Sequence, residues 1–201
     1  MKEQTIKYDN FSDDIRAMMG ISQQDFDLIK FHTIFFTTYT GAFVEHIIKI
    51  LSQHKQTRIV FEEGRGDTDR LEKSVTVWLV EVLDAKDSPE TWQWQYRIGV
   101  EHIRRRIPNR HMMVLATKIR EWVLPIMIQD LGTEEGIKLY LAFQRFLDTV
   151  IALTATLVDE GQRECLKRST GFTDTLLLRL QEIVFDDIAL ELQGQVDTDS
   201  G

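Results

Sequence analysis

An all-α fold is predicted by three observations on this 201-residue sequence. Only three prolines and eleven glycines interrupt the chain, which leaves long stretches free to form helices. Apolar residues recur at intervals of three and four along most of these stretches, and the alternating apolar-polar runs typical of strands are nearly absent. No segment is repeated and none is of low complexity. We therefore expect one helical domain with some additional tail, long enough to bury a core.

The composition argues against several classes of function. A net charge of −8 disfavours a nucleic-acid partner, because phosphate binding needs an excess of lysine and arginine. The single cysteine, Cys165, leaves no internal disulfide and suits a reducing compartment. The N-terminal residues lack the apolar segment of a secretion signal, and no uninterrupted apolar run approaches the ~18 residues of a membrane span. We expect a cytoplasmic protein that does not enter the membrane.

The first half of the chain is expected to be helical around one long polar loop. Ser22, followed three residues later by Asp25, is typical of a capping box at a helix start. Gly41 is expected to break the nearly thirty residues of apolar periodicity that follow into two helices. The other expected elements are a short helix at 11–19, a loop at 54–68, a helix from 67 or 68, a turn at 84–89 and a helix opened by Glu90.

The second half is expected to contain three more helices. One covers 112–128, with Pro125 kinking or ending it. The next runs from 133 to about 160 and carries two apolar stripes, so it lies deep in a core or covers two surfaces, one of which could be a subunit interface. Residues 161–171 look turn-like, and an amphipathic tail helix follows at 173–192.

The segment from Trp94 to Met113 is the most informative part of the chain. Ile98 and His102 share a helical face, so an imidazole points inward among aliphatic side chains. Pro108 then stops the helix. An inward histidine near a helix end is compatible with a metal or haem ligand, and equally with a core histidine bonded to a backbone carbonyl. The spacing alone leaves both readings open.

The order and spacing of these pieces resemble the haem domain of globin-coupled sensors and the related protoglobins. Residues 97–102 read Arg-Ile-Gly-Val-Glu-His, residues 104–108 read Arg-Arg-Arg-Ile-Pro, and Gln-Tyr precedes them at 95–96. An Asp-Arg-Leu segment at 69–71 lies about thirty residues upstream, as in that family. The resemblance covers roughly 20–160. It implies a globin fold over 1–165 with haem b as cofactor, His102 as proximal ligand of the iron, and an extra C-terminal helix within 166–201.

The resemblance also implies a set of residues around the haem. Relatives often carry a Phe-Tyr pair on the second helix, but counting at the family's spacing lands on Ile47 and Ile48, with Tyr39 as the less favoured register. Without that hydroxyl, bound oxygen would be poorly stabilised, whereas carbon monoxide and nitric oxide depend less on a donor. Core packing is the alternative role for each apolar residue. The implied distal residues are Ile48, Leu71, Ser74 and Val75, and the other haem contacts are Phe43, Ile98, Ile107, His111 and Met112.

Three functions follow from this resemblance. The first is a gas or redox sensor in which ligand binding at the iron is relayed through a homodimer formed by the last two globin helices, with a possible downstream signalling partner. The second is a haem-free module for dimerisation or partner docking. The third is a stand-alone protoglobin-type protein that handles O₂, CO or NO. The histidines lack zinc-site spacing and no nucleophile motif is present, so a binding domain is favoured over an enzyme.

Overall fold

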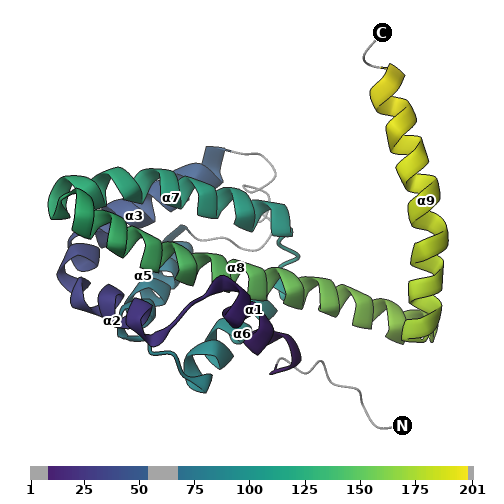
Figure 1. The fold of residues 1–201 in the computed structure, drawn as a ribbon, viewed down its shortest axis with the longest axis horizontal. Helices are drawn as coiled ribbons and strands as arrows, with labels where there is room; N and C mark the ends of the chain where they lie inside the picture. The colour runs from purple at the N-terminus through teal and green to yellow at the C-terminus, as the bar shows by residue number, and fades with distance from the viewer. Residues whose placement is uncertain (1–8, 54–67, 199–201) are drawn as a thin grey trace. The chain divides into compact units, whose positions relative to one another are not determined.

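The computed structural model describes residues 9–53 and 68–198, and every regular element within these ranges is an α-helix (Figure 1). This confirms the predicted all-α class. The chain divides into two units, residues 1–159 and 160–201, and one helix runs unbroken across the boundary between them. The helices are α1 (Asp9–Met19), α2 (Gln23–Phe31), α3 (Thr33–Gln53), α5 (Thr68–Asp84), α6 (Pro89–Arg104), α7 (Asn109–Leu131), α8 (Thr133–Thr170) and α9 (Asp174–Thr198).

The core of the first unit is built around aromatic rings on α8. Phe146 is fully buried, and the ring of Phe26 from α2 meets it edge-on with centroids 5.7 Å apart. Trp92 of α6 meets Phe26 at 5.9 Å, and Trp78 of α5 lies 6.4 Å from Phe146. Helices distant in sequence therefore converge on one cluster. Aromatic pairs of this geometry add about 0.5–1.5 kcal/mol each beyond their buried area.

An ion pair inside this unit joins α2 to α8. Asp25 is 4 % exposed; its Oδ2 accepts from the Ser22 backbone N–H at 2.9 Å, which confirms the predicted helix start. Its Oδ1 accepts from Nε of Arg145 at 3.0 Å. A buried carboxylate needs such a set of donors, because desolvation would otherwise cost several kcal/mol. The pair therefore fixes where α2 begins and where it docks.

The predicted break at Gly41 is wrong, and the break lies at His32 instead. The backbone N–H of His32 closes α2 by donating to the carbonyl of Leu28, and its ring Nε2 lies 3.0 Å from Glu135 Oε1. α3 then continues through Gly41 to Gln53. A glycine in a helix interior weakens it by about 1 kcal/mol, which the burial of α3 residues such as Phe43 readily offsets.

Two further boundaries differ from the sequence prediction. Pro125 does not end its helix, since α7 continues to Leu131; the proline is exposed, so water can reach the carbonyl that loses its donor. Residues 161–170 are helical rather than turn-like, because α8 extends to Thr170. Lys167 and Arg168 reach back to Glu164 along this extension, and such pairs stabilise a helix without an apolar stripe.

Two helices, α3 and α8, are long and apolar enough by composition to cross a membrane. This is weak evidence, because the core helices of compact proteins pass the same test. In the 18-residue apolar segment of α8 that passes this test, 56 % of the residues are buried within the protein. Two charged residues, Arg145 and Asp148, interrupt the apolar sequence of that helix. They pair with Asp25 and Arg120 of the same unit. More than half of this apolar segment of α8 is therefore already covered within the protein.

Candidate functional site

The geometry of α6 determines where its histidine lies. The helix begins behind Ser88, with Pro89 at its first position. Trp92, Gln95 and Gly99 are buried on the face toward the core. At 100° per residue, His102 lies beside this face, one turn beyond Ile98. The histidine is thus held at the border between the core side of α6 and the side that Ile98 occupies.

The imidazole of His102 is held in one tautomer. Its Nδ1 lies 2.8 Å from the backbone carbonyl oxygen of Ile98. A carbonyl can only accept, so Nδ1 carries the proton and Nε2 keeps its lone pair. Among the described residues Nε2 has no hydrogen-bond partner. Burial lowers the pKa of His102, and Arg105 lowers it further, against the opposing effect of the Ile98 carbonyl. The result is a neutral imidazole with a free nitrogen.

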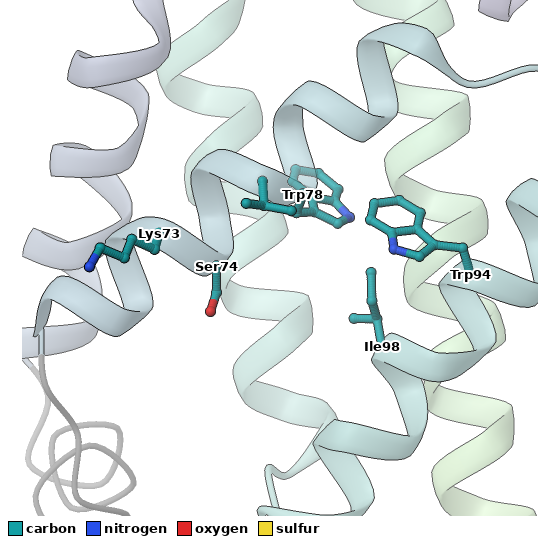
Figure 2. A pocket seen from close by; sticks show the side chains of 6 residues that line it. Lys73, Ser74, Trp78, Trp94 and Ile98 are labelled. Carbon is teal, nitrogen blue, oxygen red and sulfur yellow. The ribbon is translucent and has the colours of Figure 1, made fainter.

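An open cavity of about 350 Å³ lies between α5 and α6, and its lining includes Ile98, one turn before this histidine. The indole rings of Trp78 and Trp94 face each other across it, and Ile98 lies just below them (Figure 2). Lys73, Ser74 and Val77 complete the α5 side of the cavity. Its wall is mostly apolar, with a few polar groups at one end. A pocket of this size and character is typical of a site for a small organic ligand or cofactor.

The helical spacing of α6 places His102 one turn beyond Ile98, the last α6 residue that lines this cavity. Only four residues, 85–88, connect α5 to α6. On α6, Trp94, Ile98 and His102 follow one another at intervals of four residues, so they lie along the same side of the helix. Two members of this row line the cavity and the third carries the free imidazole nitrogen.

Of the residues predicted around a haem, the structure brings two, Ser74 and Ile98, to one pocket, and His102 is not among the residues that line it. Ser74 and Ile98 line the α5–α6 cavity, and His102 follows one turn after Ile98. Leu71 and Val75 lie on α5 with Ser74, and both are half-buried. The remaining predicted residues lie on other helices or at the α6–α7 turn: Phe43 is buried and Ile48 half-buried on α3, and Ile107, His111 and Met112 are half-buried near the start of α7.

Phe43 belongs to a second, much smaller cavity, which also involves Tyr39. This cavity of about 10 Å³ is enclosed by aromatic and aliphatic side chains of α3, α5, α7 and α8. The Tyr39 hydroxyl donates to Asp130 Oδ2 at 2.6 Å, and this bond raises the pKa of Tyr39. The hydroxyl is therefore engaged at the end of α7. Among the described residues that line the α5–α6 cavity, Tyr39 is absent and Ser74 carries the only hydroxyl.

Trp94, Lys73 and Val77 line the cavity but were not among the predicted contacts. Trp94 could have been found from the sequence, since it precedes Ile98 by the same four residues that separate Ile98 from His102. Val77 and Lys73 give no such signal, because they are exposed positions of an amphipathic helix. Their place at the cavity follows only from how α5 and α6 pack.

The donor chemistry of the site is that of a single imidazole. Among the described residues, no group of three histidine, cysteine or acidic side chains is arranged to hold a metal ion. Iron in a haem needs only one protein ligand on its proximal side, because the macrocycle supplies four nitrogens. The arrangement at His102 is compatible with that coordination and with no ordinary zinc site.

Comparison with known families identifies the chain. The family model for Protoglobin matches residues 12–162, three quarters of the sequence, and the chain belongs to this family. No curated protein matches it. Membership agrees with the eight described helices and the absence of strands among the described residues, and it confirms the globin fold. It also makes the chain a haem-binding globin, since the family binds haem and diatomic gases.

Proposed function

We propose that this globin is a gas or redox sensor that holds haem b through Nε2 of His102. The observation that carries the proposal is the bond between His102 Nδ1 and the carbonyl of Ile98, at 2.8 Å. This bond fixes the tautomer that leaves Nε2 for iron, and the acceptor makes the imidazole a stronger donor. Burial keeps the ring neutral by lowering its pKa, so no proton competes with the metal at neutral pH.

The residues of the α5–α6 cavity fit a haem. A porphyrin is a flat apolar ring with two carboxylates at one edge, and the cavity offers Trp78, Trp94 and Ile98 as apolar walls. Lys73 provides a cation at the same cavity for an acidic edge group. When haem is bound, its iron supplies the open position at which a diatomic gas coordinates. The chain's own residues bind the ring, exclude water and hold His102 in place.

The distal side favours ligands that need little hydrogen bonding. Ile48, Leu71 and Val75 are apolar, and Ser74 supplies one hydroxyl. A hydroxyl on a helix can bond its own backbone, which makes it a weaker donor than a tyrosine reaching into the pocket. Carbon monoxide and nitric oxide are therefore the preferred ligands, and dioxygen would be held less firmly.

The sensing part of the proposal needs a route from α6 to α8. Gly99 of α6 lies so close to Leu157 that a Cβ on it would be 2.7 Å from Leu157 Cδ2. At the start of α7, Asn109 donates through Nδ2 to Asp159 Oδ1 at 3.0 Å. A movement of α6 on ligand binding would thus be felt at residues 157–159 of α8. Interfaces packed this closely transmit small displacements, because they cannot deform continuously.

A homodimer formed by α7 and α8 would pass this signal to a second subunit. Both helices carry exposed apolar residues on their outer sides, including Val114 on α7 and Ile137 and Leu141 on α8. The predicted domain division, a globin at 1–165 and a tail helix within 166–201, gives such a dimer an output segment. A cytoplasmic location and a signalling partner beyond the dimer belong to the same proposal.

The absorption spectrum tests the haem assignment. Titration of the purified chain with haem should give a Soret band that shifts with carbon monoxide, together with quenching of the tryptophan fluorescence as haem enters between Trp78 and Trp94. His102→Ala should lose the shift and bind haem at least about tenfold more weakly, with partial rescue by added imidazole. His32→Gln is the matched control and should behave as the original chain. A protein that takes up no haem would leave only the interaction-module function.

A further inference from the structure

Helix α9 exposes more large apolar side chains than any other described helix. Of the nineteen large hydrophobic residues that are exposed within the described part of the chain, eight lie on α9. A solvated helix usually buries one apolar stripe and shows polar residues elsewhere. Among the α9 side chains that the structure describes, only Leu177 is buried, at 6 % exposure. So large an unpartnered apolar surface marks an interaction site.

One line of residues on α9 has the spacing of a coiled-coil seam. Leu176, Leu180, Ile183, Asp187 and Leu190 follow one another at intervals of four, three, four and three residues. The four apolar members are 40 %, 38 %, 65 % and 68 % exposed in chain order. Alternation of three and four keeps side chains on one face of a pair of supercoiled helices. The seam is apolar except at Asp187.

Two of the seven charged residues on α9, Arg179 and Asp187, lie symmetrically about Ile183. Arg179 precedes Ile183 by four residues and Asp187 follows it by four, whereas Leu176 and Leu190 lie seven residues before and after it. Among the described residues neither Arg179 nor Asp187 has an ion-pair partner. The helix therefore carries a cation and an anion at equal distances from one apolar centre, both without a counterion of their own.

We propose that α9 pairs in antiparallel orientation with α9 of a second copy of this chain, with Ile183 on the two-fold axis. Such a contact is isologous, so residue i faces residue j and j faces i. Leu176 then faces Leu190 of the partner subunit, and Asp187 faces Arg179 of the partner subunit. Each ion pair occurs twice. The antiparallel register covers Leu176, Ile183 and Leu190 of the seam and gives both charges an opposite partner.

A parallel pair in register is disfavoured by the same residues. It would place Asp187 against Asp187 of the partner subunit inside an apolar seam, and like charges in contact are destabilising. An anionic membrane is a poor alternative occupant, because lipid surfaces attract lysine and arginine and α9 carries a single arginine.

The paired region is short and is expected to give a concentration-dependent contact. From Asp174 to Leu192 it spans nineteen residues, about 28 Å at 1.5 Å per residue. Fewer than three heptads make a weak coiled coil by themselves. The α9 contact is separate from the α7–α8 dimer of the proposed function and does not depend on haem. If both form, the second contact within one assembly becomes effectively intramolecular.

A charge exchange tests the register by sedimentation equilibrium of the full chain. Arg179→Glu and Asp187→Arg should each weaken self-association about tenfold, because each change turns two attractive pairs into two repulsive ones. The double variant R179E/D187R restores both pairs and should return to the original association constant. Glu182→Arg is the matched control: it changes the charge by the same amount as Asp187→Arg but lies off the seam, so it should not weaken association.

Disulfide trapping tests the orientation independently of affinity. In a Cys165→Ser background, Leu176→Cys and Leu190→Cys chains should cross-link with each other when mixed and not with themselves. Ile183→Cys should cross-link with its own kind and serves as the positive control. Self-cross-linking of the Leu176→Cys chain would show a parallel pair and overturn the proposal. A chain that stays monomeric at a concentration of about 100 µM would also overturn the proposal, because even a weak micromolar contact would be formed there.

The haem spectrum separates this proposal from the proposed function. All four charge variants should keep the Soret band of the original chain, since α9 lies outside the residues that match the globin family. A chain that binds no haem but shows the charge-exchange pattern would refute the sensor and support the α9 pair. If the chain binds haem normally, none of the four variants changes the association constant and no mixed cross-link forms, the sensor is supported and the α9 pair is refuted.

Discussion

At the level of single residues, His102 shows how far the sequence can be taken. Helical periodicity predicted an inward histidine, and the structure places it, half-buried, beside the buried face of α6. A hydrogen bond from the imidazole to a backbone carbonyl was expected both for a core histidine and for a haem ligand, and the structure shows Nδ1 bonded to the carbonyl of Ile98. The two roles are compatible, since a ligating histidine also needs an acceptor for its second nitrogen. The bond therefore does not count against coordination; it specifies which nitrogen is available.

The lowered pKa of His102 predicts a pH dependence of stability. In the unfolded chain the imidazole titrates near its ordinary value of 6.5, whereas burial lowers its pKa in the fold. Below pH 6.5 the unfolded chain takes up a proton that the folded chain refuses, so acid favours unfolding. The stabilising contribution is complete above pH 6.5 and is lost as the pH falls through the folded pKa. Urea unfolding of haem-free protein between pH 7.5 and 5 should show this loss.

A His102→Leu variant isolates this effect from the carboxylates. Leucine does not titrate, so the difference in free energy of unfolding between the two proteins should shift in favour of the variant as the pH falls from 7.5 to 5. Acidic groups elsewhere titrate in both proteins and cancel in the subtraction. A difference that is constant with pH, or that shifts the other way, would show that the imidazole is not desolvated.

At the level of helices, the sequence predicted which elements exist better than where they end. The start of α2 at the capping box of Ser22 and Asp25 was correct, because a cap is a local interaction that the sequence shows directly. The breaks expected near Gly41 and Pro125 were wrong, because tertiary burial of α3 and α7 outweighs the local cost of these residues. Boundaries set by packing are not visible in a single sequence.

The helical glycines differ sharply in what surrounds them, which gives a testable contrast. A Cβ at Gly136 of α8 would lie 2.6 Å from the carbonyl oxygen of Met127 and 2.9 Å from Cα of Ile128, so backbone would have to move. Gly136→Ala should therefore lower the free energy of unfolding by about 1–3 kcal/mol. Gly41 of α3 has nothing within 4 Å, and Gly41→Ala should raise it by about 0.5–1 kcal/mol.

Urea unfolding monitored by far-ultraviolet circular dichroism measures both changes. Gly99→Ala provides an intermediate case, because its Cβ would meet the tip of Leu157, a flexible side chain that can rotate away. We expect Gly41→Ala to be the most stable, followed by the original chain, then Gly99→Ala and finally Gly136→Ala. If Gly136→Ala were neutral, the close approach of α7 and α8 in the structure would be wrong.

At the level of the whole molecule, the globin and its tail were predicted by different kinds of reasoning. The family resemblance rested on ordered motifs around residues 69–71 and 95–108, and it named the fold and His102. Periodicity alone found the tail helix but could not say that α8 continues to Thr170. Nor could it reveal the cavity, because Trp78 and Trp94 become neighbours only when α5 and α6 pack. The distal residues stay predictions.

Haem binding should be visible as a gain in thermal stability of the whole chain. A ligand that binds only the folded state stabilises it by about 2.7 kcal/mol at one hundred times its dissociation constant, which is about 5–10 °C in Tm for a chain of this size. Because His102 is proposed as the protein ligand of the iron, we expect His102→Ala to lose most of this gain. Glu182→Arg on α9 should keep all of it, since that residue lies outside 12–162. Calorimetry at several haem concentrations measures the shift, and a Tm that rises equally in the His102 variant would place the haem contacts elsewhere.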